Sequence, residues 1–597
     1  MDRAVEKRSA GAGDAARDGG HPPAPVREAE LPVRERRGAA RAGGAQLFRG
    51  EQDEVPDPSR GARRAGASSD GTLPSSADAS RGGGERRAER AGAPPVEETL
   101  TLSEPEGAFS ASGVLYGCLV EFLSGNGAAS LTHDQLEVRL DTDGRSLLRQ
   151  LLQDHLDLRA SREGRARAVS DSAGTLHAAV EPGHRRGLET IFGEVTVTRI
   201  AYRAKGAENL HLQDAALNLP AGRHSHGLAE LCAIEAARGS YEEAQAAIER
   251  SRGVGLAKRQ VEALTRHGAS DVETFYANAR REPAKKTDAL VVSVDGKGIV
   301  MRPDALRPAT KKAAAAGAHK LKTRLSKGEK KDRKRMAELA VVYDCTPVPR
   351  QPTDILARAE DGPKPEAPVA ANKWCTASIV ADAKEVIKAA FDEAERRDPG
   401  HERPFVALVD GARHQIDVIK REARRRHMTV TIVVDVIHVL EYLWKAARCF
   451  YSETDPAGET FVADKARSVL EGKAGIVAGA IARKATMLGL DAGARKNADE
   501  CVHYLKNKAP YLDYPTALAN GWPIATGVIE GACAHLVRDR FDITGARWSL
   551  DGAEAMLKLR AVRTNGDWKP YWQHHLAEEH KRVHATRYLD STIPQAA

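Results

Sequence analysis

The stretch Ala289-Leu290-Val291-Val292-Ser293-Val294-Asp295-Gly296 decides how this chain of 597 residues is organised. Apolar residues run into one aspartate and then a glycine, which predicts a buried strand that ends at Asp295 and a turn at Gly296. A second copy follows in Phe405-Val406-Ala407-Leu408-Val409-Asp410-Gly411. Two buried strands that each deliver a carboxylate at the C-terminal end predict two ligands of one metal site.

Strands and helices alternate around these two stretches. We expect strands near 289–295, 298–302, 338–344, 405–410 and 429–434, with helices near 382–397 and 412–427. The order is three strands, helix, strand, helix, strand, which indicates an α/β domain over residues 286–435. Amphipathic patterns then predict a helical insertion over 436–520. Residues 521–570 are expected to return to the α/β core, with one helix that begins near Gly527 and another that runs through Arg563, and a polar tail follows over 571–597.

Two regions precede the α/β domain. Residues 1–105 are rich in Ala, Gly, Arg, Pro and Ser, and such a segment cannot bury enough apolar surface to offset its ordering entropy. We expect a disordered tail, which is either dispensable or a DNA-tethering arm. Residues 106–285 are expected to be mostly helical, with a strand near 194–203. Two short helices around a glycine turn in 240–268, with Lys258 and Arg259 on the second, predict a DNA-binding helix-turn-helix or a plain helical hairpin.

The composition argues against several classes of protein. No apolar run reaches the ~18 residues of a membrane helix, and the N-terminus lacks the apolar core of a secretory signal. The seven cysteines are scattered without a Cys-x-x-Cys pair, which argues against a disulfide framework and fits a reducing cytoplasm. The net charge of +7 is compatible with a nucleic-acid partner and equally with a plain basic protein. We expect a cytoplasmic protein without a membrane partner.

Positive charge gathers between the second and third expected strands of the α/β domain. A solvated loop is the usual interpretation of such a run, but its place beside the acidic stretches favours contact with a phosphate backbone. The residues that we assign to this contact are Lys311, Lys312, Lys320, Lys322, Arg324, Lys330 and Lys331.

Glu530 is the best third acid for the site. It lies in the first turns of a helix expected from Thr526, among small residues that allow close packing. With Asp295 and Asp410 it would hold Mg²⁺ or Mn²⁺ ions, which activate the attacking oxygen and stabilise the leaving oxygen of a phosphoryl transfer. Each acid alone would instead be interpreted as a turn former or a helix cap.

Further basic and aromatic residues follow Glu530. Arg538 and Arg540 lie on the same expected helix, where either side chain would reach a phosphate or remain an ordinary exposed arginine. Arg547 and Trp548 come next, and an aromatic ring accepts nucleobases with little sequence preference. The alternative for Trp548 is a place in the core.

These motifs together resemble one group of enzymes. Over roughly residues 110–575 the chain is similar to the bacterial insertion-sequence transposases of the ISKra type, relatives of the Mutator-like group. The resemblance rests on Val294-Asp295-Gly296, Val409-Asp410-Gly411, Gly527-Val528-Ile529-Glu530-Gly531-Ala532-Cys533, Gly545-Ala546-Arg547-Trp548-Ser549, and upstream on Phe192-Gly193-Glu194-Val195 and Ser240-Tyr241-Glu242-Glu243-Ala244.

The resemblance implies a ribonuclease H-like core in which Asp295, Asp410 and Glu530 are the catalytic and metal-binding acids of a DDE transposase. It also implies that Asp435 and His438, in an Asp-x-x-His motif after the next strand, support the active site or position DNA. The alternative is that Asp435 caps a helix and His438 is a partly buried helix residue.

From the resemblance we expect an enzyme that cuts DNA at the ends of a mobile element and joins the 3′ ends to target DNA. Magnesium would be the cofactor, and the terminal inverted repeats and the target DNA would be the partners. We expect a homo-oligomer on DNA, in the bacterial cytoplasm and at the nucleoid. Two alternatives stay open: a ribonuclease H-like nuclease that only hydrolyses, and a non-catalytic DNA-binding protein derived from a transposase.

Overall fold

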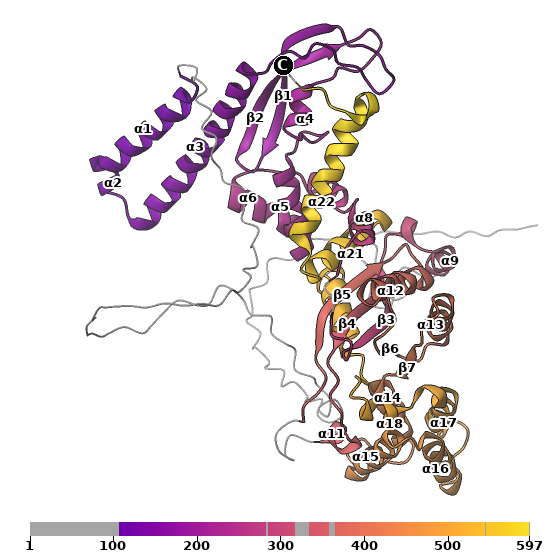
Figure 1. Cartoon of the computed structure of the whole chain (residues 1–597). Coiled ribbons are helices and arrows are strands. Elements are labelled where there is room, and N and C mark those ends of the chain that lie inside the picture. The colour runs from indigo at the N-terminus through magenta and orange to yellow at the C-terminus, as the bar shows by residue number, and fades with distance from the viewer. Residues whose placement is uncertain (1–106, 282–283, 317–332, 358–364, 544, 596–597) are drawn as a thin grey trace, which may run out of the picture. The chain divides into compact units, whose positions relative to one another are not determined.

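The computed structural model describes residues 107–281, 284–316, 333–357, 365–543 and 545–595. Within these ranges the chain is a mixed α/β protein with a five-stranded mixed sheet, a separate two-stranded hairpin and many helices (Figure 1). The tail expected over 1–105 lies outside the described residues. So do five residues assigned above to DNA contact, namely Lys320, Lys322, Arg324, Lys330 and Lys331.

The central sheet has the strand order β5-β4-β3-β6-β7. Its strands are β3 (Ala289–Val300), β4 (Lys334–Cys345), β5 (Ala370–Ser378), β6 (Phe405–Val409) and β7 (Thr431–Val434). β4 pairs antiparallel with β3 and β5, whereas β6 pairs parallel with β3 and β7. Every residue of β6 is buried, which explains its unbroken apolar run, because parallel strands are covered on both faces.

The expected turn at Gly296 is wrong. β3 continues through Asp295 to Val300 and pairs with β4 along its whole length, so the strand expected at 298–302 belongs to the second half of β3. A side chain at Gly296 would place a Cβ 3.1 Å from Met336 Cε, and one at Gly298 would place it 2.9 Å from Lys334 Cδ. These glycines therefore make room for the side chains of β4 rather than for a turn.

The third strand of the sheet is β5, which the sequence analysis missed. Apart from the buried Trp374, its residues from Ala370 to Ser378 are small or polar, and their burial does not alternate. β4 and β5 also change register between Val342 and Asp344, which breaks the period of two that identifies a strand.

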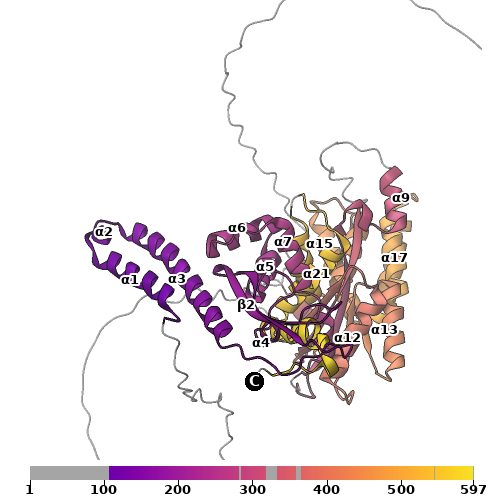
Figure 2. The same ribbon diagram turned by 90° about the horizontal axis from the view of Figure 1, so that it is seen from above.

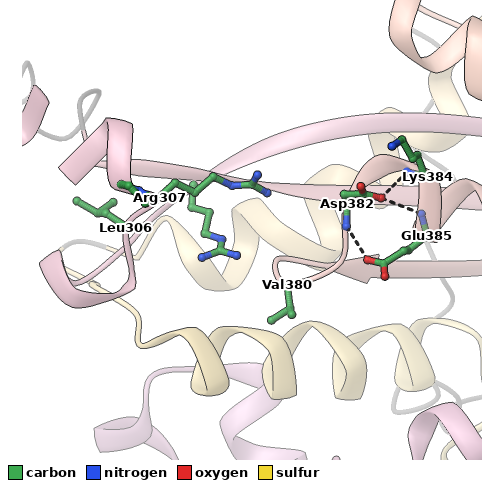
Figure 3. Close-up of a pocket in the computed structure, with 8 residues that line it drawn as sticks. Leu306, Arg307, Val380, Asp382, Lys384 and Glu385 are labelled. Carbon is green, nitrogen blue, oxygen red and sulfur yellow. Dashed lines mark hydrogen bonds between the residues drawn. The ribbon is translucent and has the colours of Figure 1, made fainter. Parts of the chain in front are cut away.

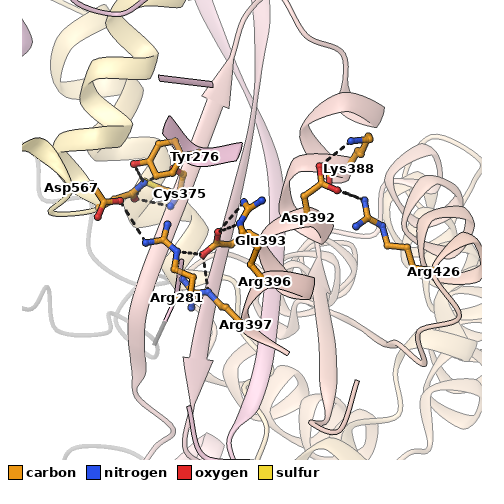
Figure 4. A network of polar contacts seen from close by, with 11 residues as sticks. Tyr276, Arg281, Cys375, Lys388, Asp392, Glu393, Arg396, Arg397, Arg426 and Asp567 are labelled. Atoms are coloured by element: carbon orange, nitrogen blue, oxygen red, sulfur yellow. Dashed lines mark hydrogen bonds and ion pairs between the residues drawn. The ribbon is translucent and has the colours of Figure 1, made fainter. Parts of the chain in front are cut away.

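One layer of helices consists of α12 (Ala383–Arg397) and α13 (Arg413–Arg425). They contact one another, and α12 packs on β3, β4 and β5 while α13 packs on β6. Glu393 of α12 is fully buried and accepts hydrogen bonds from Arg281 at 2.7 Å, Arg397 at 2.9 Å and Arg396 at 3.0 Å (Figure 4). Because Arg281 precedes β3, this network fixes the entry to the sheet against α12.

The segment after β7 is all helical. Its helices are α14 (Val436–Ala447), α15 (Pro456–Leu470), α16 (Ala474–Met487), α17 (Lys496–Lys508) and α18 (Tyr514–Ala519), with a 3₁₀ turn at Ala509–Tyr511. The chain then returns to the sheet through α19 (Gly527–Cys533), which contacts β3 and β4. A π-helical turn (Ala534–Arg538) and α20 (Asp539–Phe541) lead to α21 (Leu550–Thr564), which contacts β5.

The polar tail expected after residue 570 is wrong for most of its length. Residues 568–579 form α22 (Trp568–Glu579), in which Tyr571 and Trp572 are buried. A π-helical turn (His580–His584) and two 3₁₀ turns (Ala585–Arg587 and Leu589–Ser591) follow. The buried side chains of α22 belong to the same hydrophobic core as those of the central sheet.

The N-terminal region holds helices and the hairpin. α1 (Ser110–Ser124), α2 (Asn126–Ala129) and α3 (His133–Ser161) come first, and Figure 2 shows α1 lying beside α3, with which it is in contact. β1 (Ala179–Thr190) pairs with β2 (Gly193–Arg203). β2 agrees with the strand expected at 194–203, whereas the polar and glycine-containing β1 was not expected.

Short helices connect the hairpin to the sheet. They are α4 (Leu212–Ala216), α5 (His226–Arg238), α6 (Tyr241–Arg252), α7 (Lys258–His267) and α8 (Val272–Ala277). Ser240 caps α6 and Gly253 ends it at a φ of 67°, which forms the glycine turn expected between the two short helices. A 3₁₀ turn (Pro303–Ala305), α9 (Pro308–Ala316) and α11 (Pro352–Leu356) complete the elements. No described helix combines the length and apolarity needed to cross a bilayer.

Candidate functional site

Three aspartates lie in one row across the sheet. β3 and β6 pair in register from Leu290 with Phe405 to Ser293 with Leu408, and Asp295 and Asp410 each follow the last of these pairs by two residues. β6 and β7 pair up to Val409 with Val434, so one further step sets Asp410 beside Asp435. Residues in register on parallel strands point to the same face, about 5 Å from their neighbours. The three aspartates of this row therefore come at the level where β6 and β7 end, on neighbouring strands of the sheet.

The row lies where β3 changes its strand partner. β6 pairs with β3 only as far as Ser293, and the next pairing on that edge joins Met301 to Trp548. There Trp548 N donates to Val300 O at 3.2 Å and Arg302 N donates to Trp548 O at 2.8 Å. Between these two pairings, α19 rather than another strand packs against the edge of β3 at Asp295.

α19 packs directly against Asp295. The thiol of Cys533 donates to Asp295 Oδ2 at 3.3 Å, and Asp295 Oδ1 accepts the amide of Gly296 at 2.6 Å. Glu530 precedes Cys533 by three residues, and residues at this spacing share one side of a helix. The contact therefore turns the Glu530 side of α19 toward the first aspartate.

Asp435 ties the end of β7 to the start of α19. Its carboxylate is fully buried and accepts hydrogen bonds from Thr526 Oγ1 at 2.7 Å, Thr526 N at 3.3 Å and Ile437 N at 3.0 Å. Asp435 thus caps α14, as the simpler interpretation predicts, and also holds the residue at the N-terminus of α19. His438 is partly exposed and lies 3.5 Å from Glu441.

The acids affect one another electrostatically. Burial raises the pKa of Glu530, and the charges of Asp435 and Asp295 raise it further while His438 opposes them. Burial likewise raises the pKa of Asp435, against the hydrogen bond from Thr526. A group of carboxylates that raise the pKa values of their neighbours is stabilised when a cation binds among them.

The donor set fits magnesium or manganese. All candidate ligands are carboxylate oxygens, the hard donors that these ions prefer. Within the described residues, no three His, Cys, Asp or Glu side chains are gathered closely enough to hold one metal ion. A magnesium ion needs only one or two carboxylates when water and substrate phosphate complete its shell. The carboxylates present therefore suit ions whose coordination is completed by water and by the phosphate of a substrate.

A cavity of about 620 Å³ lies between Arg335 of β4 and the start of α12. Its charged lining residues are the basic Arg307, Arg335 and Lys384 and the acidic Asp382 and Glu385. Figure 3 shows Arg307 on one side of this cavity and the start of α12 on the other. Burial lowers the pKa of Arg335 and the charge of Arg307 lowers it further, so an anion between the two guanidinium groups would be favoured.

Glu338 links this cavity to the aspartates and was missed in the sequence analysis. It lies on β4 opposite Gly296. Burial raises the pKa of Glu338, Arg307 opposes this, and the charge of Asp295 adds to it. Only the register between β3 and β4 reveals this residue, because the strands are separated by a long stretch of sequence.

Most of the described residues assigned to DNA contact are exposed. Lys311 and Lys312 lie on α9, and Lys258 and Arg259 begin α7, where Lys258 forms an ion pair with Glu242. Arg538 and Arg547 are also exposed. Contact of these six side chains with DNA stays a prediction.

The assignment of Arg540 and Trp548 to DNA contact is wrong for this structure. Both side chains are buried, with 2% and 5% of their surface exposed. The guanidinium of Arg540 lies 4.6 Å from the ring centre of Trp548 and 5.2 Å from that of Tyr241, and it donates to Ala236 O at 2.8 Å. This cation–π stack joins α20 to α5 and α6, so neither residue is available to a phosphate or a base.

Comparison of the chain with protein-family models and with curated proteins gives no match in either case. The site must therefore be interpreted from its own geometry and from the resemblance of its motifs.

Proposed function

We propose that this chain is a DDE transposase with a ribonuclease H-like core, which cleaves DNA at the ends of a mobile element and transfers the strands to target DNA. The row of Asp295, Asp410 and Asp435, with α19 and Glu530 held against it, is the observation that carries the proposal. The motifs that resemble the ISKra-type transposases surround these same acids.

The order of elements supports the proposed core. From β3 onward the chain runs through three strands with the short helices α9 and α11 between them, then α12, β6, α13 and β7, followed by the helices of the insertion and by α19. Apart from the two short helices this is the order expected from the sequence, although two of the three leading strands differ from those expected. The guanidinium groups of Arg307 and Arg335 and the exposed lysines of α9 support DNA as the substrate, because phosphate contacts dominate its binding.

Each residue of the site has a defined task in this proposal. Asp295, Asp410 and Glu530 would hold the ions, while Asp435 positions α19 through Thr526. When bound, the ions activate the attacking oxygen and stabilise the leaving one. Arg307 and Arg335 would fix a backbone phosphate beside the acids, which sets the direction of the scissile strand. The 3′ hydroxyl freed by cleavage then has to remain near the same acids to attack target DNA.

Strand transfer separates the proposal from the two alternatives. Purified full-length protein is given a pre-cut duplex that carries the element's end, target plasmid and Mg²⁺, and joined products are sought on a gel. Joined products support the transposase. Hydrolysis without joining would identify a nuclease, and DNA binding without either reaction would identify a non-catalytic binding protein.

Two substitutions test the assignment of the acids. Asp410→Asn and Asp295→Asn keep the size of the side chain but remove the charge, so we expect cleavage to disappear while DNA binding remains. Glu453→Gln is the matched control, because that carboxylate is 77% exposed and pairs with Arg448 in the helical insertion. Cleavage that survives Asp410→Asn contradicts the assigned site.

Assembly of two copies is part of the proposal, because two DNA ends must be joined at one place. Apolar side chains of α1 and α3, including Val114, Tyr116 and Val138, are 66%, 61% and 68% exposed, and a second copy would cover them. Light scattering of the wild type and of Val138→Glu tests this. An oligomer that Val138→Glu leaves intact contradicts the assignment of this surface.

A further inference from the structure

Cys533 at the end of α19 has no task in the proposed reaction, although its thiol lies against one of the acids. The thiol donates to Asp295 Oδ2 at 3.3 Å, and only 4% of the residue is exposed. An ionised carboxylate only accepts hydrogen bonds, so the shared proton is that of the thiol. We propose that Cys533 is a positioning residue, which holds the Asp295 carboxylate in the orientation that a metal ion needs. This inference rests on the proposed function, because that function makes Asp295 a ligand.

The three aspartates of the row differ in the side chains that donate to them. Each accepts one backbone amide from a residue that follows it: Asp295 from Gly296 at 2.6 Å, Asp410 from Ala412 at 2.7 Å and Asp435 from Ile437 at 3.0 Å. Within the described residues, a side chain donates only to the first and the last of them. Thr526 Oγ1 reaches Asp435 at 2.7 Å, and Cys533 is the only side-chain donor to Asp295.

Both of these side-chain donors come from one helix. Thr526 precedes α19, Cys533 is its last residue, and Glu530 lies between them. The two ends of α19 are therefore tied to the aspartates on either side of Asp410 in the row. The tie at Thr526 places the start of the helix, and the tie at Cys533 sets the first carboxylate relative to Glu530.

Cys533 is held in place by contacts other than the one with Asp295. Leu536 and Val537 of the π-helical turn that follows it are fully buried. Arg560 of α21 donates to the carbonyl of Leu536 at 3.1 Å, which anchors the same turn. Because this packing fixes the end of α19, the thiol has a set position from which it orients the carboxylate before a metal ion arrives.

A thiol is a suitable donor to a carboxylate that must also bind metal. The S–H group forms weaker hydrogen bonds than N–H or O–H, so it orients the oxygen without competing strongly for its lone pairs. Removal of a hydrogen-bond partner from a ligating group typically lowers metal affinity or activity by about 10- to 100-fold. For so weak a donor we expect the lower end of this range.

Binding of Mn²⁺ tests the inference without a reaction. Free Mn²⁺ is measured by electron paramagnetic resonance during titration of the full-length protein in complex with the pre-cut duplex, with the duplex alone as the blank. Cys533→Ala should raise the dissociation constant of Mn²⁺ about ten-fold, whereas Cys533→Ser keeps a donor and should stay within about three-fold of the wild type. Cys232→Ala removes a thiol that is equally buried but has no hydrogen-bond partner within the described residues, and should change nothing.

Infrared difference spectroscopy reports on the hydrogen bond itself. Subtraction of the Cys533→Ser spectrum from that of the wild type isolates the S–H stretching band of Cys533. The same subtraction in the Asp295→Asn background should give a band at higher frequency, because a neutral amide is a weaker acceptor than a carboxylate. A band at the same frequency in both backgrounds would overturn the contact on which the inference depends.

The remaining outcomes separate the inference from the proposed function. An unchanged dissociation constant in Cys533→Ala would overturn the inference, even if the wild type transfers strands. Equal rises in Cys533→Ala and Cys533→Ser would also overturn it, because both variants lose the sulfur but only serine keeps a donor. A wild type that shows the shifted band and the loss of Mn²⁺ affinity in Cys533→Ala, but joins no strands, would overturn the proposed function alone.

Discussion

Thr526→Val should uncouple Glu530 from the rest of the site. Thr526 Oγ1 donates to the buried carboxylate of Asp435 at 2.7 Å, and no part of this contact involves the proposed substrate. Valine keeps the shape of the side chain but removes the donor, so Asp435 retains only the amides of Thr526 and Ile437. The loss of a hydrogen bond to a buried charged group costs about 1.5–3 kcal/mol.

The effect on catalysis should exceed the effect on stability. Thr526 precedes α19, so its displacement moves Glu530, and a shift of about 1 Å in a catalytic group can cost on the order of 100-fold in rate. Thr526→Ser keeps the hydroxyl and loses one methyl group, which costs about 1 kcal/mol but leaves the link to Asp435 intact. The pair of variants therefore separates packing from positioning.

Two measurements decide the outcome. Single-turnover cleavage of DNA at saturating Mg²⁺ should be about 10- to 100-fold slower for Thr526→Val and close to the wild-type rate for Thr526→Ser. Amide hydrogen exchange in residues 527–533 should be faster only in Thr526→Val, which reports on α19 independently of activity. Wild-type cleavage and exchange in Thr526→Val would refute the role given to Asp435.

Three other predictions follow from contacts described above. The pKa of Glu530 is raised and metal binding needs its deprotonated carboxylate, so the acidic limb of the pH–rate profile should lie above the ordinary glutamate value of 4.5. Asp435→Asn removes a neighbouring negative charge and should move the acidic limb of the residual activity to lower pH; an unmoved limb would contradict the coupling of the two acids. Glu393→Gln leaves three arginines around a neutral buried group and should lower the free energy of unfolding in urea by about 3–5 kcal/mol. The exposed Glu453→Gln should lower it by about 0–1 kcal/mol, and equal losses in the two variants would contradict the role of the Glu393 network. Arg307→Ala should weaken binding to DNA of every sequence and reduce the slope of the logarithm of the association constant against the logarithm of the salt concentration by about one. Fluorescence anisotropy measures this slope, and the control Arg448→Ala should leave it unchanged.

The acid-bearing strands could be predicted because burial leaves a strong pattern. β6 is buried throughout and β3 is buried up to Val294, so each gives an uninterrupted apolar run before its aspartate. α12 and α13 begin and end within two residues of the expected bounds, because their apolar positions recur with the helical period. The parallel pairing of β3 with β6 confirms that the two apolar runs lie side by side in one sheet.

Other features depend on contacts that sequence patterns do not contain. The glycine after Asp295 continues the strand because β3 stays paired with β4 there, with Gly296 opposite Glu338. Arg540 carries a full charge and was therefore expected at the surface, but the rings of Tyr241 and Trp548 on distant elements accommodate it in the core. The sequence shows Asp435 only as part of a motif. Its hydrogen bond with Thr526 could not be predicted, because the helical insertion separates the two residues in the sequence.

The switch of strand partners along β3 has a consequence for the order in which the chain is synthesised. β6 reaches β3 soon after Asp410 leaves the ribosome, but the segment that pairs with Met301 and the helix that faces Asp295 follow only after the whole insertion has been made. A nascent chain, or one ended early by a stop codon, therefore has two of the acids and an open strand edge but not the third acid. In the proposed transposase, DNA cleavage would therefore require the full-length chain, and truncated products would bind DNA without cutting it.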